Sequence, residues 1–92
     1  NYRCRFGELD IVAQQDGVLA FVEVKLRRNS SFAPARAFVT TDKQRKLRSA
    51  AESYLQEHPG RLQPRFDVAE VYAPQGRETA RPTITYLESA FF

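Results

Sequence analysis

The pattern of apolar and polar positions predicts several short strands and a helix near the middle of the chain. The strand-like segments, which alternate or are rich in β-forming residues, are residues 1–6, 8–14, 18–26, 65–73 and 83–89. The apolar positions that recur at helical spacing are Leu47, Ala50, Ala51, Tyr54 and Leu55. Thr41 or Asp42 is a suitable N-cap for this helix, and Pro59 and Gly60 end it near His58.

The order of these segments predicts an α/β fold. The helix connects the strand at residues 18–26 to the strand at residues 65–73, and such a βαβ unit is expected to have parallel strands and a right-handed crossover. We therefore expect a mixed β-sheet in the order βββαβ(β), with the helix on one face. The 92 residues, of which 42% are hydrophobic, suit a single domain over residues 1–92.

Two acidic strands joined by a tight turn carry the candidate chemistry. The dipeptide Asp16-Gly17 suits a two-residue hairpin turn because glycine tolerates positive φ. With this turn, the residue numbers of facing pairs sum to 33. Asp10 is then expected opposite Glu23, and Glu8 opposite Lys25, on the same side of the sheet.

This register predicts three carboxylates and one ammonium on one face, which is the outline of a metal site. Facing like charges cost stability, and Mg²⁺ or Mn²⁺ ions would relieve that cost. The alternative is a solvated face with an ordinary cross-strand Glu–Lys pair. Leu19 and Phe21 share the alternation of Glu23, which indicates a partly covered face and favours the metal site. The apolar residues expected to be buried on the opposite face are Leu9, Ile11, Val22 and Val24.

Basic residues are concentrated just after this hairpin, although the net charge is only +3. They are Arg27, Arg28, Arg36, Lys43, Arg45, Lys46 and Arg48. The first three lie in or beside an irregular loop, and the others lie in the first turns of the helix, where cations oppose the helix dipole. A phosphate bound at the helix start would explain them, and Gln44 could also reach it. The alternative is an ordinary solvated surface.

Other features bound the class of protein. The single cysteine, Cys4, fits a reducing compartment, and no apolar run approaches the roughly 20 residues of a membrane span. A signal peptide is also not evident, so we expect a cytoplasmic protein. The chain has no methionine, which indicates that Asn1 is an internal position of a longer protein.

Several motifs together resemble a known family. They are GELDIV at residues 7–12, FVEVK at residues 21–25, the helix that contains Lys43, and RFDV at residues 65–68. Asp10 followed by Glu23-Val24-Lys25 has the form D-x(n)-E-x-K, which by itself is weak. The full series resembles the YraN-like family of bacterial putative endonucleases, within the PD-(D/E)XK nuclease superfamily and near archaeal Holliday-junction resolvases. The resemblance covers nearly the whole chain up to about Tyr72.

The resemblance implies a restriction-endonuclease-like core and a role for each motif residue. Asp10 and Glu23 would be metal-binding carboxylates, and Lys25 would orient or deprotonate the attacking water or steady charge on the phosphate. Glu8 matches an acidic position of the family and would be a further ligand or a supporting group, and the Val24 carbonyl would be an additional ligand. The family usually begins with a helix that carries its own glutamate, and this chain is expected to lack it.

The expected function is that of a Mg²⁺- or Mn²⁺-dependent endonuclease that hydrolyses DNA, including branched or single-stranded DNA, with a homodimer as a possible assembly. A second hypothesis is a nucleic-acid-binding module that keeps the fold and does not cleave. A third is a partner-binding domain whose hairpin charges serve solubility. For Asp67, in the fourth strand, a structural hydrogen bond is favoured over metal binding.

Overall fold

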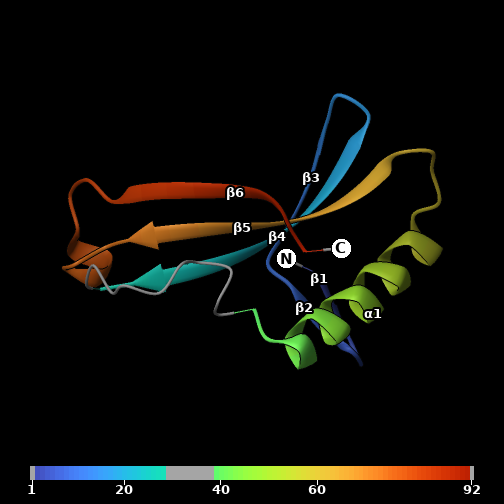
Figure 1. The fold of residues 1–92 in the computed structure, drawn as a ribbon, viewed down its shortest axis with the longest axis horizontal. Coiled ribbons are helices and arrows are strands. Elements are labelled where there is room, and N and C mark those ends of the chain that lie inside the picture. Colours follow the sequence, from blue (N-terminus) through green and yellow to red (C-terminus); the bar gives the residue numbers. More distant parts are fainter. Residues whose placement is uncertain (1, 29–38, 92) are drawn as a thin grey trace.

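The structure, a computed structural model, describes residues 2–28 and 39–91. Its elements in chain order are β1 (Tyr2–Cys4), β2 (Gly7–Leu9), β3 (Ile11–Gln15), β4 (Val18–Arg27), α1 (Thr41–Glu57), β5 (Gln63–Tyr72), the 3₁₀ helix η2 (Gly76–Glu78) and β6 (Thr83–Phe91). Figure 1 shows a long sheet with α1 lying across one end of it. The described part of the chain is therefore a mixed α/β structure. None of its helices is long and apolar enough to cross a membrane.

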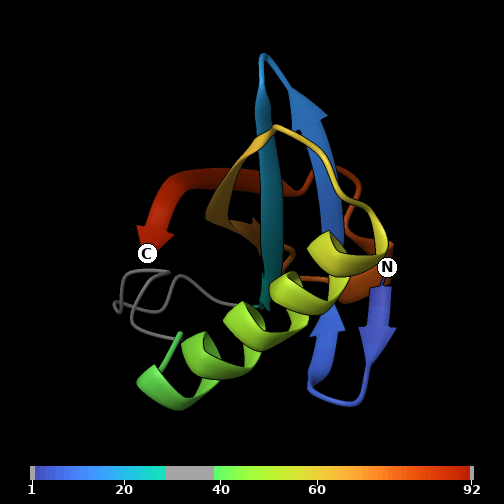
Figure 2. The same cartoon turned by 90° about the vertical axis from the view of Figure 1, so that its right-hand side faces the viewer.

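The main sheet has four strands in the order β3-β4-β5-β6. β3 and β4 are antiparallel, β4 and β5 are parallel, and β5 and β6 are antiparallel. The parallel pair is joined through α1, as the sequence predicted for the βαβ unit. A separate two-stranded ladder, β1-β2, lies beside α1 (Figure 2).

The hairpin formed by β3 and β4 has the predicted register. Ile11 lies opposite Val22 and Gln15 opposite Val18. Asp16 and Gly17 both have positive φ, at 50° and 78°, which is the backbone geometry of a type I′ turn. Such a turn matches the twist of the two strands, so it fixes which residues face one another.

The predicted second strand is wrong in one respect, because it is divided at Asp10. Residues Gly7–Leu9 leave the hairpin and pair with Tyr2–Cys4, while Ile11–Gln15 remain on β4. Leu9 thereby reaches the core on the α1 side and is 2% exposed, whereas Ile11 is 46% exposed. The break at Asp10 allows Leu9 to be buried in the core while Ile11 lies on the exposed face. In an unbroken strand the two residues would lie on the same face.

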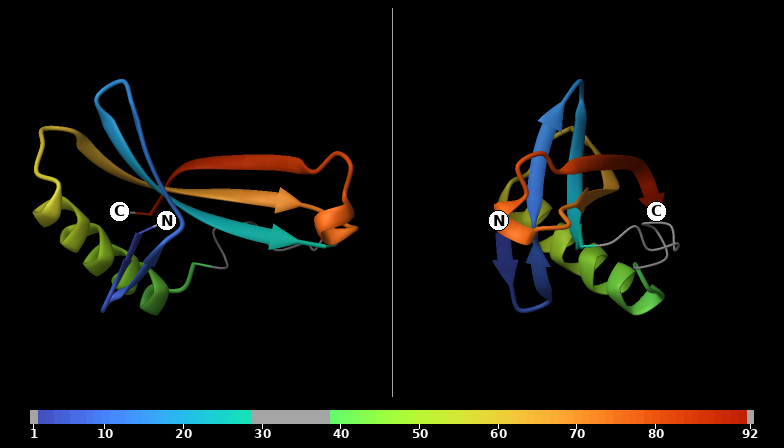
Figure 3. Two further views of the ribbon diagram at one scale, coloured as in Figure 1. Left: turned by 180° about the vertical axis from the view of Figure 1, so that it is seen from behind. Right: turned by 90° about the vertical axis from the view of Figure 1, so that its left-hand side faces the viewer.

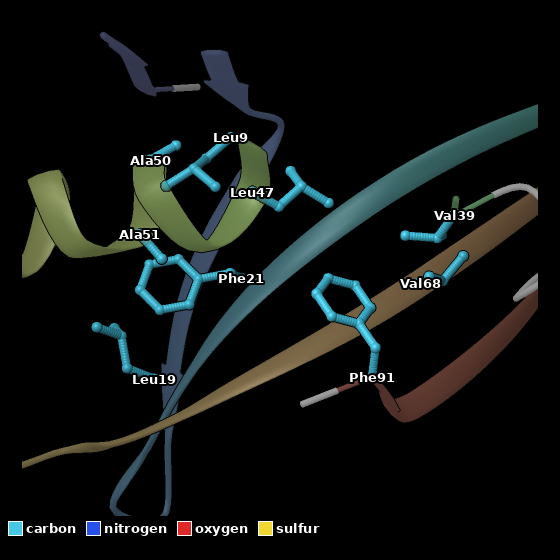
Figure 4. Close-up of a cluster of buried hydrophobic side chains, with 9 residues drawn as sticks. All are labelled: Leu9, Leu19, Phe21, Val39, Leu47, Ala50, Ala51, Val68 and Phe91. Carbon is cyan, nitrogen blue, oxygen red and sulfur yellow. The ribbon is translucent and has the colours of Figure 1, made fainter. Parts of the chain in front are cut away.

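The core lies between α1 and the sheet (Figure 4). Leu47, Ala50 and Ala51 form the buried stripe of the helix, as predicted. They pack with Leu19 and Phe21 of β4. Because side chains alternate along a strand, Glu23 and Lys25 lie on this same face of β4, whose first half is covered by α1. The remaining buried residues of this core are Leu9, Val39, Val68 and Phe91.

The helix begins one or two residues earlier than predicted. Thr40, rather than Thr41 or Asp42, is the N-cap, and its Oγ1 accepts a hydrogen bond from the Lys43 N–H at 3.2 Å. The C-cap is His58, as expected from Pro59 and Gly60.

Among the described residues, α1 covers only one face of the main sheet. Figure 3 shows the molecule in two further views, in which the opposite face has no α-helix against it. Ala20, Val22 and Ala69 make a small buried cluster there. Beyond it the large side chains that remain exposed are Ile11, Leu26, Ile84 and Tyr86.

Candidate functional site

Asp10 lies between β2 and β3, directly before the first residue of β3, and its side chain reaches the centre of β4. Its Oδ2 accepts a hydrogen bond from the Val24 N–H at 2.9 Å. This carboxylate takes the place of the backbone carbonyl that an unbroken strand would offer, because the residues before Asp10 belong to β2 and pair with β1 instead of β4. The geometry brings Asp10 next to the residue that follows Glu23, as the predicted D-x(n)-E-x-K site requires.

Val24 is a candidate ligand through its backbone. In an extended strand the N–H and C=O of one residue are directed to the same neighbouring strand. The Val24 carbonyl is therefore directed to the same side of β4 as its N–H. That side carries Asp10 and the position that Leu9 would occupy in an unbroken hairpin. A backbone oxygen and a carboxylate are hence placed on one edge of β4.

Glu23 lies on the α1 side of β4 and forms an ion pair with Lys43 from the first turn of α1. The Glu23 side chain is only 11% exposed, and that of Lys43 is 44% exposed. A mostly covered carboxylate is thus reached by an ammonium that comes from the solvent side. Lys43 was predicted as a phosphate contact, and its described partner is this carboxylate.

Lys25 shares the face of Glu23, because the two residues are separated by one position in a strand. Across the parallel pair Lys25 lies opposite Glu70 of β5. Glu70 in turn accepts a hydrogen bond from Arg27 Nη1 at 2.8 Å, and both of these side chains are largely buried. Charges of alternating sign therefore follow one another along this face of the sheet.

Glu8 does not lie opposite Lys25, contrary to the predicted register. It belongs to β2 and lies opposite Arg3 of β1, with an ion pair of 3.6 Å between Arg3 Nε and Glu8 Oε2. The reason is the break at Asp10, which removes β2 from the hairpin. Among the residues that the structure describes, no group of three or more His, Cys, Asp or Glu side chains is arranged to hold a metal ion.

The oxygen donors of Asp10 and of the neighbouring part of β4 are of the kind that a small hard cation prefers. Asp10 and Glu23 supply carboxylate oxygens, and Val24 supplies a backbone oxygen. Mg²⁺ is commonly held by one or two carboxylates, with water and substrate phosphate completing its shell. The lysine on Glu23 shows that this carboxylate already attracts a positive group.

The basic residues of the predicted nucleic-acid surface have several different environments. Arg27 is held by Glu70, and the Arg28 guanidinium lies beside Gly76, while Arg36 lies outside the described residues. Figure 1 shows that the end of β4 and the first turn of α1 lie well apart.

On the helix, Arg45 and Lys46 both pair with Asp42 and stay largely exposed. The Gln44 side chain donates to the Val39 carbonyl at 3.0 Å. The exposed part of the predicted surface is therefore the outer side of the first turns of α1.

Asp67 lies on the other face of the sheet and is fully buried. Its carboxylate accepts hydrogen bonds from Arg65, from the Tyr86 hydroxyl and from the Ser89 N–H. Burial alone would raise the pKa of the Asp67 carboxyl, but these donors outweigh it and hold the pKa below its ordinary value. The prediction of a structural hydrogen bond for Asp67 is confirmed.

The contact between Lys43 and Glu23 was not predicted from the sequence. Its signal was present, because a lysine in the first turn of a helix is unfavourable for the helix itself. We interpreted that signal as a phosphate site. The actual partner comes from a strand 20 positions earlier in the chain, and such a tertiary contact has no local pattern.

Comparison with known proteins gives consistent results. The model of the uncharacterised protein family UPF0102 matches residues 1–71. A UPF0102 protein of Nitrosomonas europaea is 37% identical over 91 residues, which cover 99% of this chain and 73% of the relative. A UPF0102 protein of Nocardia farcinica is 41% identical over 92 residues, which cover 99% of this chain and 70% of the relative.

Proposed function

The chain belongs to the uncharacterised protein family UPF0102, and from its site we propose that it is a divalent-metal-dependent endonuclease that hydrolyses DNA phosphodiester bonds. In this proposal its sheet and helix are a restriction-endonuclease-like core of the PD-(D/E)XK kind, as the resemblance to YraN-like proteins implies. The substrate includes branched or single-stranded DNA.

The observation that carries the proposal is the contact of the Asp10 carboxylate with the Val24 N–H, which places Asp10 beside the residue that follows Glu23. Asp10 holds this position at a strand break that allows the core to bury Leu9. Lys25 follows Glu23 on the same face of β4. Two hard oxygen ligands beside an ammonium are the groups that phosphodiester hydrolysis needs.

Each residue has a role that its position allows. Asp10 and Glu23 would hold Mg²⁺ or Mn²⁺, with the Val24 carbonyl as a further ligand. The metal would supply an activated water and positive charge near the phosphate. The Lys25 ammonium donates to a phosphate oxygen or to the attacking water, as a point charge that needs no fixed direction of approach.

The exposed cations at the start of α1 are proposed to contact the DNA backbone. Arg45 and Lys46 are suitable, because their shared partner Asp42 neutralises only part of their charge. They lie one helical turn or less from Lys43, whose ammonium reaches the candidate metal site.

One observation favours a second candidate function, a nucleic-acid-binding module that does not cleave. Within the described residues, the site has two carboxylates rather than three, and one of them is neutralised by a lysine. A site of this kind could keep the surface for a polyanion without holding a metal firmly.

Metal binding and DNA cleavage together test the proposal. We would measure Mn²⁺ binding by calorimetry, and cleavage of end-labelled single-stranded and four-way-junction DNA, for the unchanged chain and for Asp10→Asn, Glu23→Gln and Lys25→Met. Glu52→Gln, which changes an exposed carboxylate of α1, is the matched control.

We expect both carboxylate variants to lose Mn²⁺ binding and cleavage, and Lys25→Met to lose cleavage while it still binds Mn²⁺. DNA binding without Mn²⁺ binding or cleavage would support the binding module instead. Equal cleavage by all variants would show that another site or a contaminant is responsible.

A further inference from the structure

We propose that Lys43 couples metal binding to nucleic-acid binding. Its ammonium pairs with Glu23 until a phosphate of the nucleic acid binds that ammonium instead. This inference rests on the proposed function. It adds a positioning residue, outside the D-x(n)-E-x-K motif, that determines when the metal site is available.

The first argument is the shape of the contact between Lys43 and Glu23. Lys43 comes from the helix and Glu23 from the centre of β4, so the pair connects two elements that are distant in sequence. Because the lysine end is 44% exposed and the glutamate end 11% exposed, the ammonium can leave toward solvent while the carboxylate stays in place. The pair can therefore open without unpacking the core.

The second argument is that helix stability does not account for Lys43. The Lys43 backbone N–H is already bound by Thr40, and Asp42, the acidic residue of the first turn, is shared by Arg45 and Lys46. A lysine at this position weakens the helix through the dipole. Its side-chain partner is Glu23, one of the two carboxylates proposed to hold the metal.

The third argument is charge balance. An ammonium and a divalent cation on one carboxylate repel each other, so each weakens the contact of the other with Glu23. A metal that binds Glu23 therefore weakens the hold on Lys43, and the ammonium becomes more available to a phosphate. In the other direction, a phosphate that draws Lys43 away leaves Glu23 open to the metal.

Thermodynamic linkage makes these two effects equal. If DNA raises the affinity for the metal by some factor, the metal raises the affinity for DNA by the same factor. For a half-exposed ion pair we expect a factor of about five. The active site would then be assembled chiefly when DNA is bound. Without DNA, the protein would bind little metal at low metal concentrations.

The test measures Mn²⁺ affinity, from the electron paramagnetic resonance signal of free Mn²⁺, with and without a short phosphorothioate oligothymidylate that resists cleavage. Mn²⁺ bound by the oligonucleotide alone is measured separately and subtracted. The variants are Lys43→Met, Lys43→Arg and Arg61→Met. The last removes an exposed positive charge from the segment between α1 and β5, which has no part in the proposed site.

We expect the oligonucleotide to increase the Mn²⁺ affinity of the unchanged chain about fivefold. Lys43→Met should bind Mn²⁺ about fivefold more tightly without oligonucleotide, and should gain less than about twofold from it. Lys43→Arg should retain the coupling, and Arg61→Met should keep both the Mn²⁺ affinity and the coupling of the unchanged chain.

Two results would overturn the inference, and they differ in what they say of the proposed function. If Mn²⁺ and oligonucleotide both bind but the coupling factor is the same in Lys43→Met, the inference is wrong and the nuclease proposal stands. If the unchanged chain binds no Mn²⁺ with or without oligonucleotide, both fail.

Discussion

The Asp10 carboxylate accepts a hydrogen bond from the Val24 backbone N–H at 2.9 Å, and so joins the break between β2 and β3 to the centre of β4. This contact gives Asp10 two separable roles. Its oxygen atoms cap a backbone donor of β4, and its charge is available to a cation.

Two substitutions of Asp10 should separate those roles. Asp10→Asn keeps a side-chain oxygen that can accept the Val24 N–H, so we expect little loss of stability and a loss of Mn²⁺ binding. Asp10→Ala leaves that donor without its partner and should lower the free energy of unfolding by a further 1–2 kcal/mol or so. Urea unfolding and Mn²⁺ calorimetry measure the two effects. An Asp10→Asn variant that binds Mn²⁺ normally would contradict the metal role.

Glu8 should contribute little to metal binding. It lies on the β1-β2 ladder, opposite Arg3, rather than opposite Lys25. We expect Glu8→Gln to change Mn²⁺ affinity less than about twofold, because the Glu8 carboxylate is exposed to solvent and pairs with Arg3. The measurement is Mn²⁺ calorimetry of Glu8→Gln, compared with that of Asp10→Asn. A loss as large as that of Asp10→Asn would restore Glu8 to the metal site and count against the ladder described here.

Asp67 should be important for stability. It is fully buried and receives donors from Arg65, Tyr86 and Ser89. Asp67→Asn removes the charge and weakens all three contacts, so we expect about 3 kcal/mol less free energy of unfolding. Urea unfolding is the measurement, with Glu52→Gln as an exposed control. A difference between the two variants below about 1 kcal/mol would contradict a structural role of that size.

The same carboxylate predicts a dependence of stability on pH. Because the pKa of Asp67 is lower in the folded protein than in the unfolded chain, its contribution is complete above the unfolded value of about 4. The contribution is lost as the pH falls through the lower folded value. The urea midpoints of the unchanged chain and Asp67→Asn should therefore converge below about pH 4 and differ fully at pH 7. A constant difference over this range would show that the charge of Asp67 does not matter.

The turn between β3 and β4 should be sensitive to one methyl group. Gly17 has a φ of 78°, which disfavours residues with a Cβ, although no atom lies within 4 Å of the position a Cβ would take. Gly17→Ala should therefore lower the free energy of unfolding by about 1 kcal/mol through the backbone alone. Gly60→Ala, where space is equally open and φ is ordinary, is the matched control. Equal unfolding midpoints for the two variants would contradict this explanation.

The sequence predicted the features that depend on local chemistry. The Asp16-Gly17 turn specified the register of the β3–β4 hairpin, and the spacing of Leu47, Ala50 and Ala51 specified the buried face of α1. The parallel pairing of β4 and β5 followed from the order strand, helix, strand. Asp67 was correctly interpreted as structural.

The features that were not predicted depend on the tertiary core. An unbroken alternation placed Leu9 and Ile11 on one face, but the core beneath α1 has room for Leu9 and the strand breaks at Asp10 to supply it. Glu8 then moves to another ladder, although its sequence position beside Asp10 suggested a shared site. The contact of Lys43 with Glu23 also needs the helix in place, so no pattern within either segment could identify it.

The order of strands in the main sheet also has a consequence for how the chain folds. β3 and β4 are joined by two residues, so their pairing costs little loop entropy, whereas β4 and β5 can pair only after the whole segment that contains α1 has been closed. We expect the hairpin to form in the folding transition state and the β4–β5 ladder to be completed later. Stopped-flow kinetics would then show that Gly17→Ala mainly slows folding, while Val68→Ala in β5 mainly accelerates unfolding. The opposite assignment of the two rates would place the parallel pair, and with it the covering of Glu23, at the start of folding.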